Sequence, residues 1–536
     1  MTALCFFAIG AVACSADDVT LSPLPQAGIG GSPGGHAGTS PTTGGASAAG
    51  KAGAGGSLGK GGAAGSLGKG GAGGGAAGAS GNAGASGKAS VGGGGQSGGG
   101  ASGSGGNAGN GGKAGAGGKS GAGGSNAAGA AGAGGTTAKK FCDLPPGAPT
   151  KLVVPDGFCV RPFTAPNLVP EPRTIRIAPN GDVFIFSPGH STPGGSFGGL
   201  GAIVVLPDDD HDGLADARVI FAGGTAQTSE DCAAHDVNPN DLTCGHGLAF
   251  IDGFLYFTRW NDVLRYPYQT GDRAAQSAPE LVTKLGVDKP GDWRFTHTLD
   301  RAPNGDVLVS RGRFDSIACS VDSMAEGAVF RLPVGAGVPA TPEVLSQGFR
   351  NPMYIRCHPT SGACFANELS GDVWEGVGGH EKLALLKPGG NWGYPCCVDQ
   401  GQPINGGTSE LCATVDTGLV SFPLHDTPFG LDFNRGSFPG KYENALFVAD
   451  HGRVGSWAGT QVVWYATDPS GMPIPDADPN ALPTPFVTGF GKGKDSVNGR
   501  ATDLAFAPDG RMFLIDDTSS EVWWIAPVDL EAPPGW

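Results

Sequence analysis

Short runs of alternating apolar and polar residues, each preceded by a tight turn, recur along the chain after residue 177. The clearest run is Asp306 to Ser310, which follows the turn Pro303-Asn304-Gly305. Asn-Gly and Asp-Gly supply the positive φ angles that tight hairpins require, and the alternation lets the following strand bury one face. Copies of this pattern begin at residues 178, 250, 302, 358, 433 and 507. The pattern therefore predicts six hairpins of one design.

The spacing of the six copies predicts the architecture. From 178 to 507 the interval averages about 66 residues, which suits a four-stranded propeller blade with long loops. We therefore predict an all-β fold, a six-bladed β-propeller at 141–536, with a large β-sandwich as the alternative. Blade one is expected to begin with strands at 152–154 and 172–177, and the segment 387–395 is expected to close blade four. The last strands, including 521–525, should close the ring by pairing with the start of the domain.

Glycine is distributed very unevenly along the chain. There are 99 glycines among 536 residues, and residues 27 to about 138 are almost entirely Gly, Ala, Ser, Asn and isolated Lys. Such a segment buries too little apolar surface to offset its ordering entropy, and it lacks the strict three-residue glycine period of collagen. We therefore predict a disordered Gly/Ala/Ser-rich linker at 15–140, ahead of the propeller.

The first fourteen residues, 1–14, are apolar and short, as in the hydrophobic region of a secretion signal. The sequence Ala11-Val12-Ala13-Cys14 resembles a bacterial lipoprotein cleavage site, after which Cys14 would carry the lipid. We therefore expect an exported protein, lipid-anchored to the cell envelope in the periplasm or at the outer surface. Because a positively charged leader is missing, plain secretion and a non-functional start remain alternatives.

The cysteines are consistent with export. Ten of the twelve lie in the predicted propeller, and an even number in an exported chain favours disulfides over metal or redox chemistry. Proximity in the sequence suggests three pairs and leaves four further cysteines for two more: Cys142 with Cys159, Cys232 with Cys244, Cys357 with Cys364, and then Cys319, Cys396, Cys397 and Cys412.

The charge of the chain limits its partners. The formal net charge is −15 and no basic stripe is visible, which argues against nucleic acid and against adsorption to an anionic membrane. Membrane contact is expected only through a lipid on Cys14. The predicted partner is a small molecule that meets a few localised arginines.

An acidic segment resembles the first nine positions of a calcium-binding loop. Gly213 permits the sharp turn, and Val219 stands where an acidic twelfth residue is usual. A surface turn with solvated aspartates is the alternative to a bound structural calcium. The predicted metal ligands are Asp208, Asp210, Asp212 and Asp216.

Several histidines and arginines occupy equivalent places next to the core strand of their blade. Equivalent loops of a propeller converge on one mouth of the central channel, where guanidinium groups would grip a small ligand with several carboxylates. Taken singly, a histidine at a strand end is more often a packing or capping residue, so only the group is informative. Its members are His297, Arg350, Asn351, His451, Arg453 and Arg500.

Four segments resemble the glucose/sorbosone dehydrogenase family, whose members are six-bladed propellers of the bacterial periplasm that depend on pyrroloquinoline quinone (PQQ). They are Gly348-Phe-Arg-Asn-Pro352, Lys387-Pro-Gly-Gly-Asn-Trp-Gly-Tyr-Pro395, Asp450-His-Gly-Arg453, and Gly499-Arg500 followed by Asp503-Leu-Ala-Phe-Ala-Pro-Asp-Gly510. The resemblance covers about residues 150–528 and is most specific in blades four to six.

The resemblance implies a quinoprotein that oxidises a sugar hydroxyl or aldehyde. His297 matches the base that takes the substrate proton, and an imidazole is suited to that role near neutral pH. Arg350 and Asn351 match residues that polarise the quinone oxygens, and Arg500 matches the first of two arginines that clamp the cofactor. In the family a calcium ion bridges protein carbonyls and the cofactor, at a turn that corresponds roughly to 368–370. The electron acceptor is left open.

Three positions depart from the family pattern. Thr502 stands where the second clamping arginine is expected, Arg313 stands where an aspartate is expected, and 451–453 replaces an expected lysine. Two other functions are therefore kept beside the dehydrogenase. One is a non-catalytic propeller that binds a glycan or a protein partner at the cell surface. The other is a lactonase-type hydrolase with a metal held by Glu368 and Asp450.

Overall fold

The computed structural model divides the chain into two compact units, 1–124 and 125–536. All residues whose structure is described belong to the second unit. They are 139–188, 201–224, 238–286, 297–313, 318–370, 380–398, 401–423, 426–452, 459–474, 483–491, 499–534 and 536.

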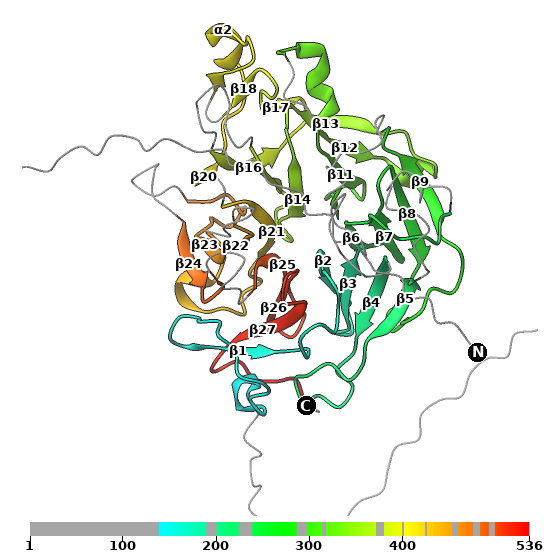
Figure 1. Ribbon diagram of the computed structural model, residues 1–536, viewed down its shortest axis with the longest axis vertical. Coiled ribbons are helices and arrows are strands. Elements are labelled where there is room, and N and C mark those ends of the chain that lie inside the picture. Colours follow the sequence, from blue (N-terminus) through cyan, green and yellow to red (C-terminus); the bar gives the residue numbers. More distant parts are fainter. Residues whose placement is uncertain are drawn as a thin grey trace, which may run out of the picture. The chain divides into compact units, whose positions relative to one another are not determined.

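Six antiparallel sheets lie around a common centre, each with its first strand innermost (Figure 1). Blades one to three contain β2 (Thr174–Ile177), β3 (Val183–Ser187), β4 (Ala202–Leu206) and β5 (Val219–Gly223); β6 (Leu248–Ile251), β7 (Phe254–Thr258), β8 (Asp262–Pro267) and β9 (Glu280–Lys284); and β10 (Leu299–Arg301), β11 (Val307–Arg311), β12 (Ala328–Leu332) and β13 (Glu343–Gln347). Blades four to six contain β14 (Pro352–Cys357), β15 (Cys364–Glu368), β16 (Glu381–Leu386) and β20 (Val420–Phe422); β21 (Pro428–Phe433), β22 (Leu446–Asp450), β23 (Gln461–Tyr465) and β24 (Thr484–Val487); and β25 (Ala501–Phe506), β26 (Met512–Asp516) and β27 (Glu521–Pro527). The predicted six-bladed propeller is confirmed.

The six predicted hairpins are the turns between the first and second strands of the six blades. Each of these turns contains at least one glycine in the left-handed region, where a side chain would be strained. These glycines are Gly181, Gly253, Gly305, Gly362, Gly436 and Gly510.

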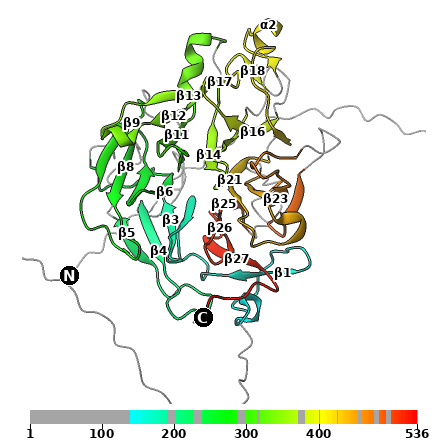
Figure 2. The same ribbon diagram turned by 180° about the vertical axis from the view of Figure 1, so that it is seen from behind.

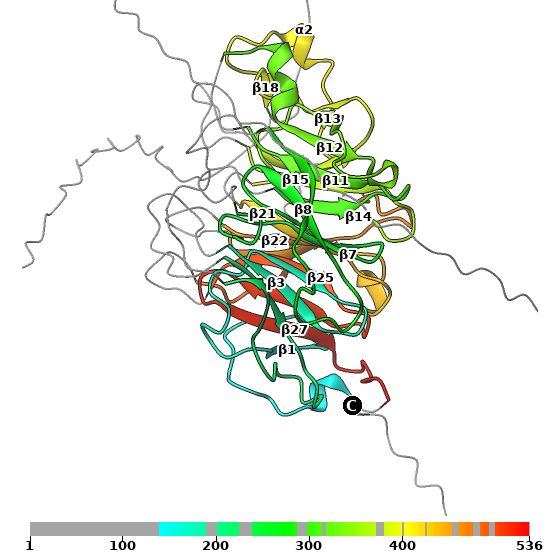
Figure 3. The same ribbon diagram turned by 90° about the vertical axis from the view of Figure 1, so that its right-hand side faces the viewer.

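The ring closes as the sequence predicts, with the start of the domain completing the last blade. Strand β1 (Phe158–Pro162) pairs antiparallel with β27, so blade six also has four strands. Figures 2 and 3 show β1 beside β27 from behind and from the side. The placement of 152–154 in blade one was wrong. Val153 forms an antiparallel bridge with Thr488, which follows blade five, because the chain passes that blade before it reaches β1.

The hydrophobic core is divided among the junctions between neighbouring blades. Ile185 and Val204 of blade one pack in one cluster with Phe513 and Trp524 of blade six. The other five junctions each have a cluster of this kind. This arrangement buries both faces of every sheet and leaves the inner ends of the strands to carry polar groups.

A disulfide-bonded insertion follows β16. Within it, β17 (Gly390–Asn391) pairs parallel with β13 of blade three, so 387–395 extends blade three and does not close blade four. The insertion continues through β18 (Cys397–Val398), β19 (Gln402–Pro403) and the helix α2 (Ser409–Cys412). The other helical turns in the described part of the chain are η1 (Phe141–Asp143), η2 (Val321–Glu326), η3 (Val334–Ala336) and η4 (Gly440–Tyr442).

Four disulfides join described residues. The predicted pairs Cys142–Cys159 and Cys357–Cys364 are confirmed, and the other four cysteines pair as Cys319–Cys396 and Cys397–Cys412. Cys244 is disulfide-bonded as well, whereas its predicted partner Cys232 lies outside the described residues. Among the described helices, none has the length and apolar character needed to cross a membrane.

Candidate functional site

Polar side chains converge at one end of the central ring. In each blade the first strand begins, and the second strand ends, at the same edge of the sheet, because the two are antiparallel. Residues just before the first strand and just after the second therefore meet around the axis. We call this end the mouth and define it by Arg173, His246, His297, Arg350, Asn351, His451, Arg500 and Asp517. Every predicted cofactor or catalytic residue that the structure describes belongs to this set.

Asp517 is the anion at which three blades meet. Its Oδ2 lies 2.8 Å from Arg173 Nη1 of blade one and 2.9 Å from His451 Nε2 of blade five. Burial tends to raise the pKa of Asp517, but His451, Arg173 and Arg500 outweigh it and hold the pKa below its usual range. Burial, together with Arg500, lowers the pKa of His451 to about 3. At neutral pH a neutral His451 therefore donates its Nε2 hydrogen to an ionised Asp517.

Two backbone carbonyls hold the Arg500 guanidinium. Its Nε donates to His451 O and its Nη2 to Gly452 O, both at 2.9 Å. Burial lowers the pKa of Arg500 to about 10, which still leaves it charged at neutral pH. Thr502, at the position of the expected second arginine, is fully buried, donates to Arg500 O at 3.2 Å and accepts from Asp517 N at 3.2 Å. Arg173, from blade one, supplies the second guanidinium beside Asp517.

Arg350 and Asn351 stand at the start of β14. Arg350 Nη1 donates to Ser370 O at 2.6 Å, and its backbone N–H donates to Glu368 Oε1 at 2.7 Å. Asn351 is buried, and its Nδ2 contacts Met353 Sδ at 3.0 Å, a weak acceptor. The Arg350 guanidinium therefore hydrogen-bonds to Ser370 O, a backbone carbonyl in the turn 368–370 where the family resemblance implied a calcium ion.

His297 is fully enclosed by protein. Its Nδ1 lies 3.0 Å from Ser310 O and its Nε2 lies 3.0 Å from Trp260 O, and the side chain is 0% exposed. Burial lowers its pKa to about 4, so the ring is neutral at pH 7. A neutral imidazole has one N–H, so only one carbonyl receives a hydrogen bond while the lone pair of the other nitrogen faces an oxygen. Neither ring nitrogen is open to a ligand in this arrangement.

His246 is also buried, yet it has both ring nitrogens without a hydrogen-bond partner. Burial, with Arg173 and His297 near by, lowers its pKa well below the ordinary value, so the ring is neutral. It packs edge-on against Tyr354, whose hydroxyl donates to Arg173 O. The next residue, Gly247, must be glycine, since a Cβ there would lie 2.7 Å from His297 O. His246 therefore offers a donor and an acceptor that no group among the described residues uses.

Five of the six residues predicted for the mouth lie at this end of their blades, beside the first or second strand. Arg453 lies outside the described residues, and Arg313 forms an ion pair with Glu326 at 3.2 Å. Sequence reasoning missed Arg173, His246 and Asp517. The signal was present, because Arg173 and His246 precede the first strand of their blades as His297, Arg350 and Arg500 do.

The predicted metal ligands lie elsewhere, in the turn between β4 and β5. Oxygen atoms of Asp208, Asp210 and Asp216 all lie within 4.8 Å of one another. Asp212 is not part of this group, and its Oδ1 accepts from Leu214 N at 2.8 Å. Three of the four predicted ligands are therefore brought together.

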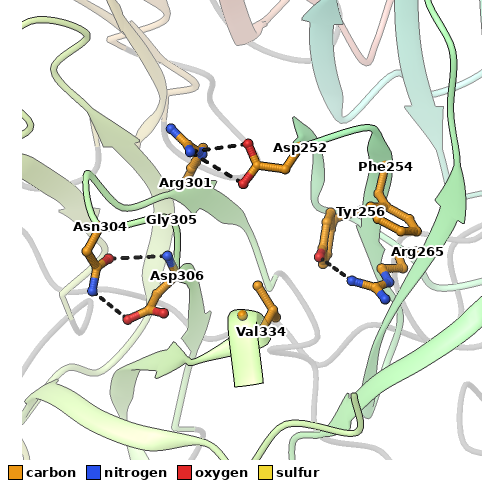
Figure 4. Close-up of a pocket in the computed structure, with 10 residues that line it drawn as sticks. Asp252, Phe254, Tyr256, Arg265, Arg301, Asn304, Gly305, Asp306 and Val334 are labelled. Carbon is orange, nitrogen blue, oxygen red and sulfur yellow. Dashed lines mark hydrogen bonds and ion pairs between the residues drawn. The ribbon is translucent and has the colours of Figure 1, made fainter. Parts of the chain in front are cut away.

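A hollow of about 350 Å³ lies at the opposite ends of the innermost strands, beside the hairpin turns of blades two and three. Figure 4 shows its charged groups already paired, with Arg301 facing Asp252 and Arg265 facing Tyr256. It contains no residue of the mouth, so we assign it no role in the chemistry.

Comparison with known proteins places the fold. The PQQ domain of a pyranose dehydrogenase from Coprinopsis cinerea, in its holo form, is 18% identical with a TM-score of 0.56, over 71% of this chain and 98% of that one. The calcium structure of a carbohydrate-active enzyme of family AA12 from Trichoderma reesei is 19% identical with a TM-score of 0.54, over 70% of this chain and 97% of that one. At these identities the likeness establishes a shared fold.

Sequence comparison adds little about function. No protein-family model matches the chain. An uncharacterized protein of Borreliella burgdorferi is 25% identical over 185 residues, which is 34% of this chain. The matched part spans about half of that relative's length, 48%.

Proposed function

We propose that the protein is an exported quinoprotein-type dehydrogenase that binds PQQ, with calcium, at the mouth and oxidises a hydroxyl or aldehyde group of a sugar. The observation that carries the proposal is His246, a fully buried imidazole with two unused ring nitrogens beside Arg173. A buried polar group without a partner is costly, so such a group points to a ligand that supplies one. The fold shared with a PQQ domain supports the same ligand.

The charges of the mouth fit a quinone that carries several carboxylates. Arg173, Arg350 and Arg500 come from three different blades, and guanidinium groups bind carboxylates in a charge-assisted, bidentate manner. Asp517 compensates part of this positive charge and fixes Arg173 in place. These three arginines would hold the cofactor, and His246 would hydrogen-bond to it. When bound, PQQ supplies an electrophilic quinone carbon that accepts a hydride.

The proton of the substrate hydroxyl needs a base, and His297 is the residue that we assign to this role. Its ring is neutral at pH 7, as a base must be, but one nitrogen must first turn away from Ser310 O or Trp260 O. His297 and His246 then have separable roles, since the first moves a proton and the second holds the ligand.

Reconstitution of the purified full-length chain tests this assignment. With PQQ and calcium added, we expect dye-linked oxidation of at least one aldose in a panel. His297→Ala should abolish turnover while PQQ is still retained, and His246→Ala should release PQQ. A wild-type protein that retains PQQ but oxidises no sugar would refute the dehydrogenase, and one that retains none would refute the cofactor.

The calcium of the proposal requires its own control. Ser370 O, at the turn where the family resemblance puts a calcium, receives a hydrogen bond from Arg350. A guanidinium in that place repels a divalent cation, so the reconstitution should be run with calcium and with a chelator. If PQQ is retained equally in both, calcium is not part of the cofactor site.

A second function is favoured by the closure of His297. Both ring nitrogens of His297 lie against backbone carbonyls, so the ring cannot take a proton from a substrate in this arrangement. This favours a non-catalytic propeller that binds a glycan or a protein partner through the mouth. Saturable glycan binding without turnover would establish it. We do not propose a lactonase, because Glu368 is engaged by Lys382 at 3.4 Å and by Arg350 N.

Export is supported by the four disulfides between described residues, since such bonds persist in oxidising compartments. We propose in addition that Cys14 carries a lipid at the cell envelope. In a bacterial host, the wild-type chain should take up labelled fatty acid and partition into detergent. Cys14→Ser should do neither, and equal labelling of both chains would refute the anchor.

A further inference from the structure

The acidic loop, residues 207–216, lies at the junction where the ring closes. It connects β4 to β5 of blade one, yet it packs against blade six and both ends of the domain. Trp524 Nε1 of β27 donates to Gly213 O at 2.8 Å, and a Cβ on Gly213 would lie 2.9 Å from Leu144 Cδ1. His211 stacks on Trp536, the last residue, at 4.7 Å and 18°. The loop therefore touches the segments whose association closes the ring.

The carboxylates of the loop are divided between two tasks. Asp209 does not belong to the carboxylate group and pairs with Arg273, whose Nη2 lies 2.6 Å from its Oδ1. Asp208, Asp210 and Asp216 face one another, with ligand oxygens within 4.8 Å. Like charges at this separation repel one another, and a cation bound between them would relieve that repulsion.

Asp208 gives a separate indication of a missing partner. Its side chain is 8% exposed, and its Oδ2 has no hydrogen-bond partner. Arg511 Nη1 lies 3.9 Å from this oxygen, too far for a hydrogen bond. Arg511 is therefore a distant ion-pair partner, and a buried carboxylate oxygen with only this long ion pair calls for a closer cation or donor.

We propose that Asp208, Asp210 and Asp216 bind one calcium ion, and that this ion fastens the junction between blades one and six. Calcium takes six to eight oxygen ligands in adaptable geometry, whereas magnesium demands a small octahedral site. A loop in which three carboxylate oxygens lie within 4.8 Å of one another suits the ion with the more adaptable geometry. The site is distinct from the mouth, because the loop joins the outer strands β4 and β5.

Binding is tested with terbium, which replaces calcium and emits when an indole near by is excited. Trp524 and Trp536 both contact the loop, so we expect sensitised emission that saturates and is displaced by calcium far better than by magnesium. Asp210→Asn combined with Asp216→Asn should abolish the signal. Asp209→Asn, which removes the same charge from the same loop, should retain it. Absence of emission from the wild-type chain, or equal loss in the control, would overturn the site.

The fastening role is tested on the wild-type chain, so it does not depend on a variant that folds. Calcium should raise the Tm by at least about 2 °C relative to a chelator. It should also slow amide hydrogen exchange in β1 and β27 more than in β14 and β15 of blade four. Terbium binding with no change in Tm or in exchange would contradict the structural role. Neither measurement uses PQQ, so the result is independent of the proposed dehydrogenase.

Discussion

The three histidines of the mouth differ in what surrounds their ring nitrogens. His451 has a carboxylate partner, His297 has two carbonyls, and His246 has no hydrogen-bond partner in the part of the chain that the structure describes. All three are buried, so their rings are neutral at pH 7. The sequence could identify His297 and His451 as members of a group, but it could not distinguish a sealed ring from an open one, because the difference lies in the distant residues Trp260 and Ser310.

Arg173 was not among the predicted site residues, yet the structure places it at the mouth beside Asp517. If it replaces the missing second arginine, Arg173→Gln should weaken PQQ binding roughly 10- to 100-fold, the value of one charge-assisted hydrogen bond. Arg265→Gln serves as the control, because Arg265 lies beside the hollow at the opposite ends of the strands. Equilibrium dialysis with PQQ measures both, and equal affinities for the two variants would contradict the assignment.

Stability should depend on pH through His297. Its pKa falls from about 6.5 in the unfolded chain to about 4 in the fold, so the unfolded chain binds more protons below pH 6.5. The stabilisation from the neutral ring is complete above pH 6.5 and declines by about 1.4 kcal/mol per pH unit as the pH falls toward 4. His297→Asn cannot bind this proton. Urea unfolding should therefore show the gap between wild type and variant shifting by this amount per pH unit, whereas a constant gap would contradict the burial of the ring.

At the scale of elements, carboxylates join the innermost strands of neighbouring blades by hydrogen bonds. Asp503 of β25 accepts from Ile175 N of β2 at 3.0 Å, and Asp432 of β21 accepts from Phe506 N of β25 at 2.9 Å. Asp300 of β10 does the same for Cys357 N of β14, at 2.8 Å. In this way backbone N–H groups of an innermost strand donate hydrogen bonds to a carboxylate on the innermost strand of the neighbouring blade.

Asp503 should be the most costly of these links to remove, since it also pairs with Arg176 at 3.0 Å and is fully buried. Asp503→Ala leaves a buried guanidinium without its partner, and we expect the free energy of unfolding to fall by about 3–5 kcal/mol. Asp529→Ala removes an exposed aspartate that pairs with Lys140, and it should leave the denaturation midpoint unchanged. If both variants unfold at the wild-type midpoint, the carboxylate links do not hold the blades.

Local turn chemistry made the elements predictable, whereas their partners were harder to predict. Each hairpin turn contains a glycine with positive φ, and such turns can be recognised in the sequence. Six recognisable turns therefore predict six blades. Residues 152–154 and 387–395 were misplaced because an apolar run or a Gly-Gly turn does not say which sheet edge it meets. Val153 joins the edge after blade five, and Gly390–Asn391 joins blade three.

For the whole molecule, ring topology converts scattered residues into one site. Arg173, Arg350 and Arg500 are far apart in the sequence, and they lie at the same end of the ring because each precedes the innermost strand of its blade. The repeat spacing was enough to predict this convergence. The pairing of Arg173 with Asp517, and of Arg350 with Ser370 O, depends on side-chain geometry at the blade junctions and was not visible in the sequence.

Retention of the quinone is the most direct test of a ligand site at the mouth. The purified full-length chain is incubated with PQQ, desalted, and scanned for quinone absorbance, beside a double variant carrying Arg173→Gln and Arg500→Gln. We expect about one PQQ per wild-type chain and none on the variant. A wild-type chain that emerges without quinone absorbance, or a double variant that retains as much as the wild type, would contradict the proposed site.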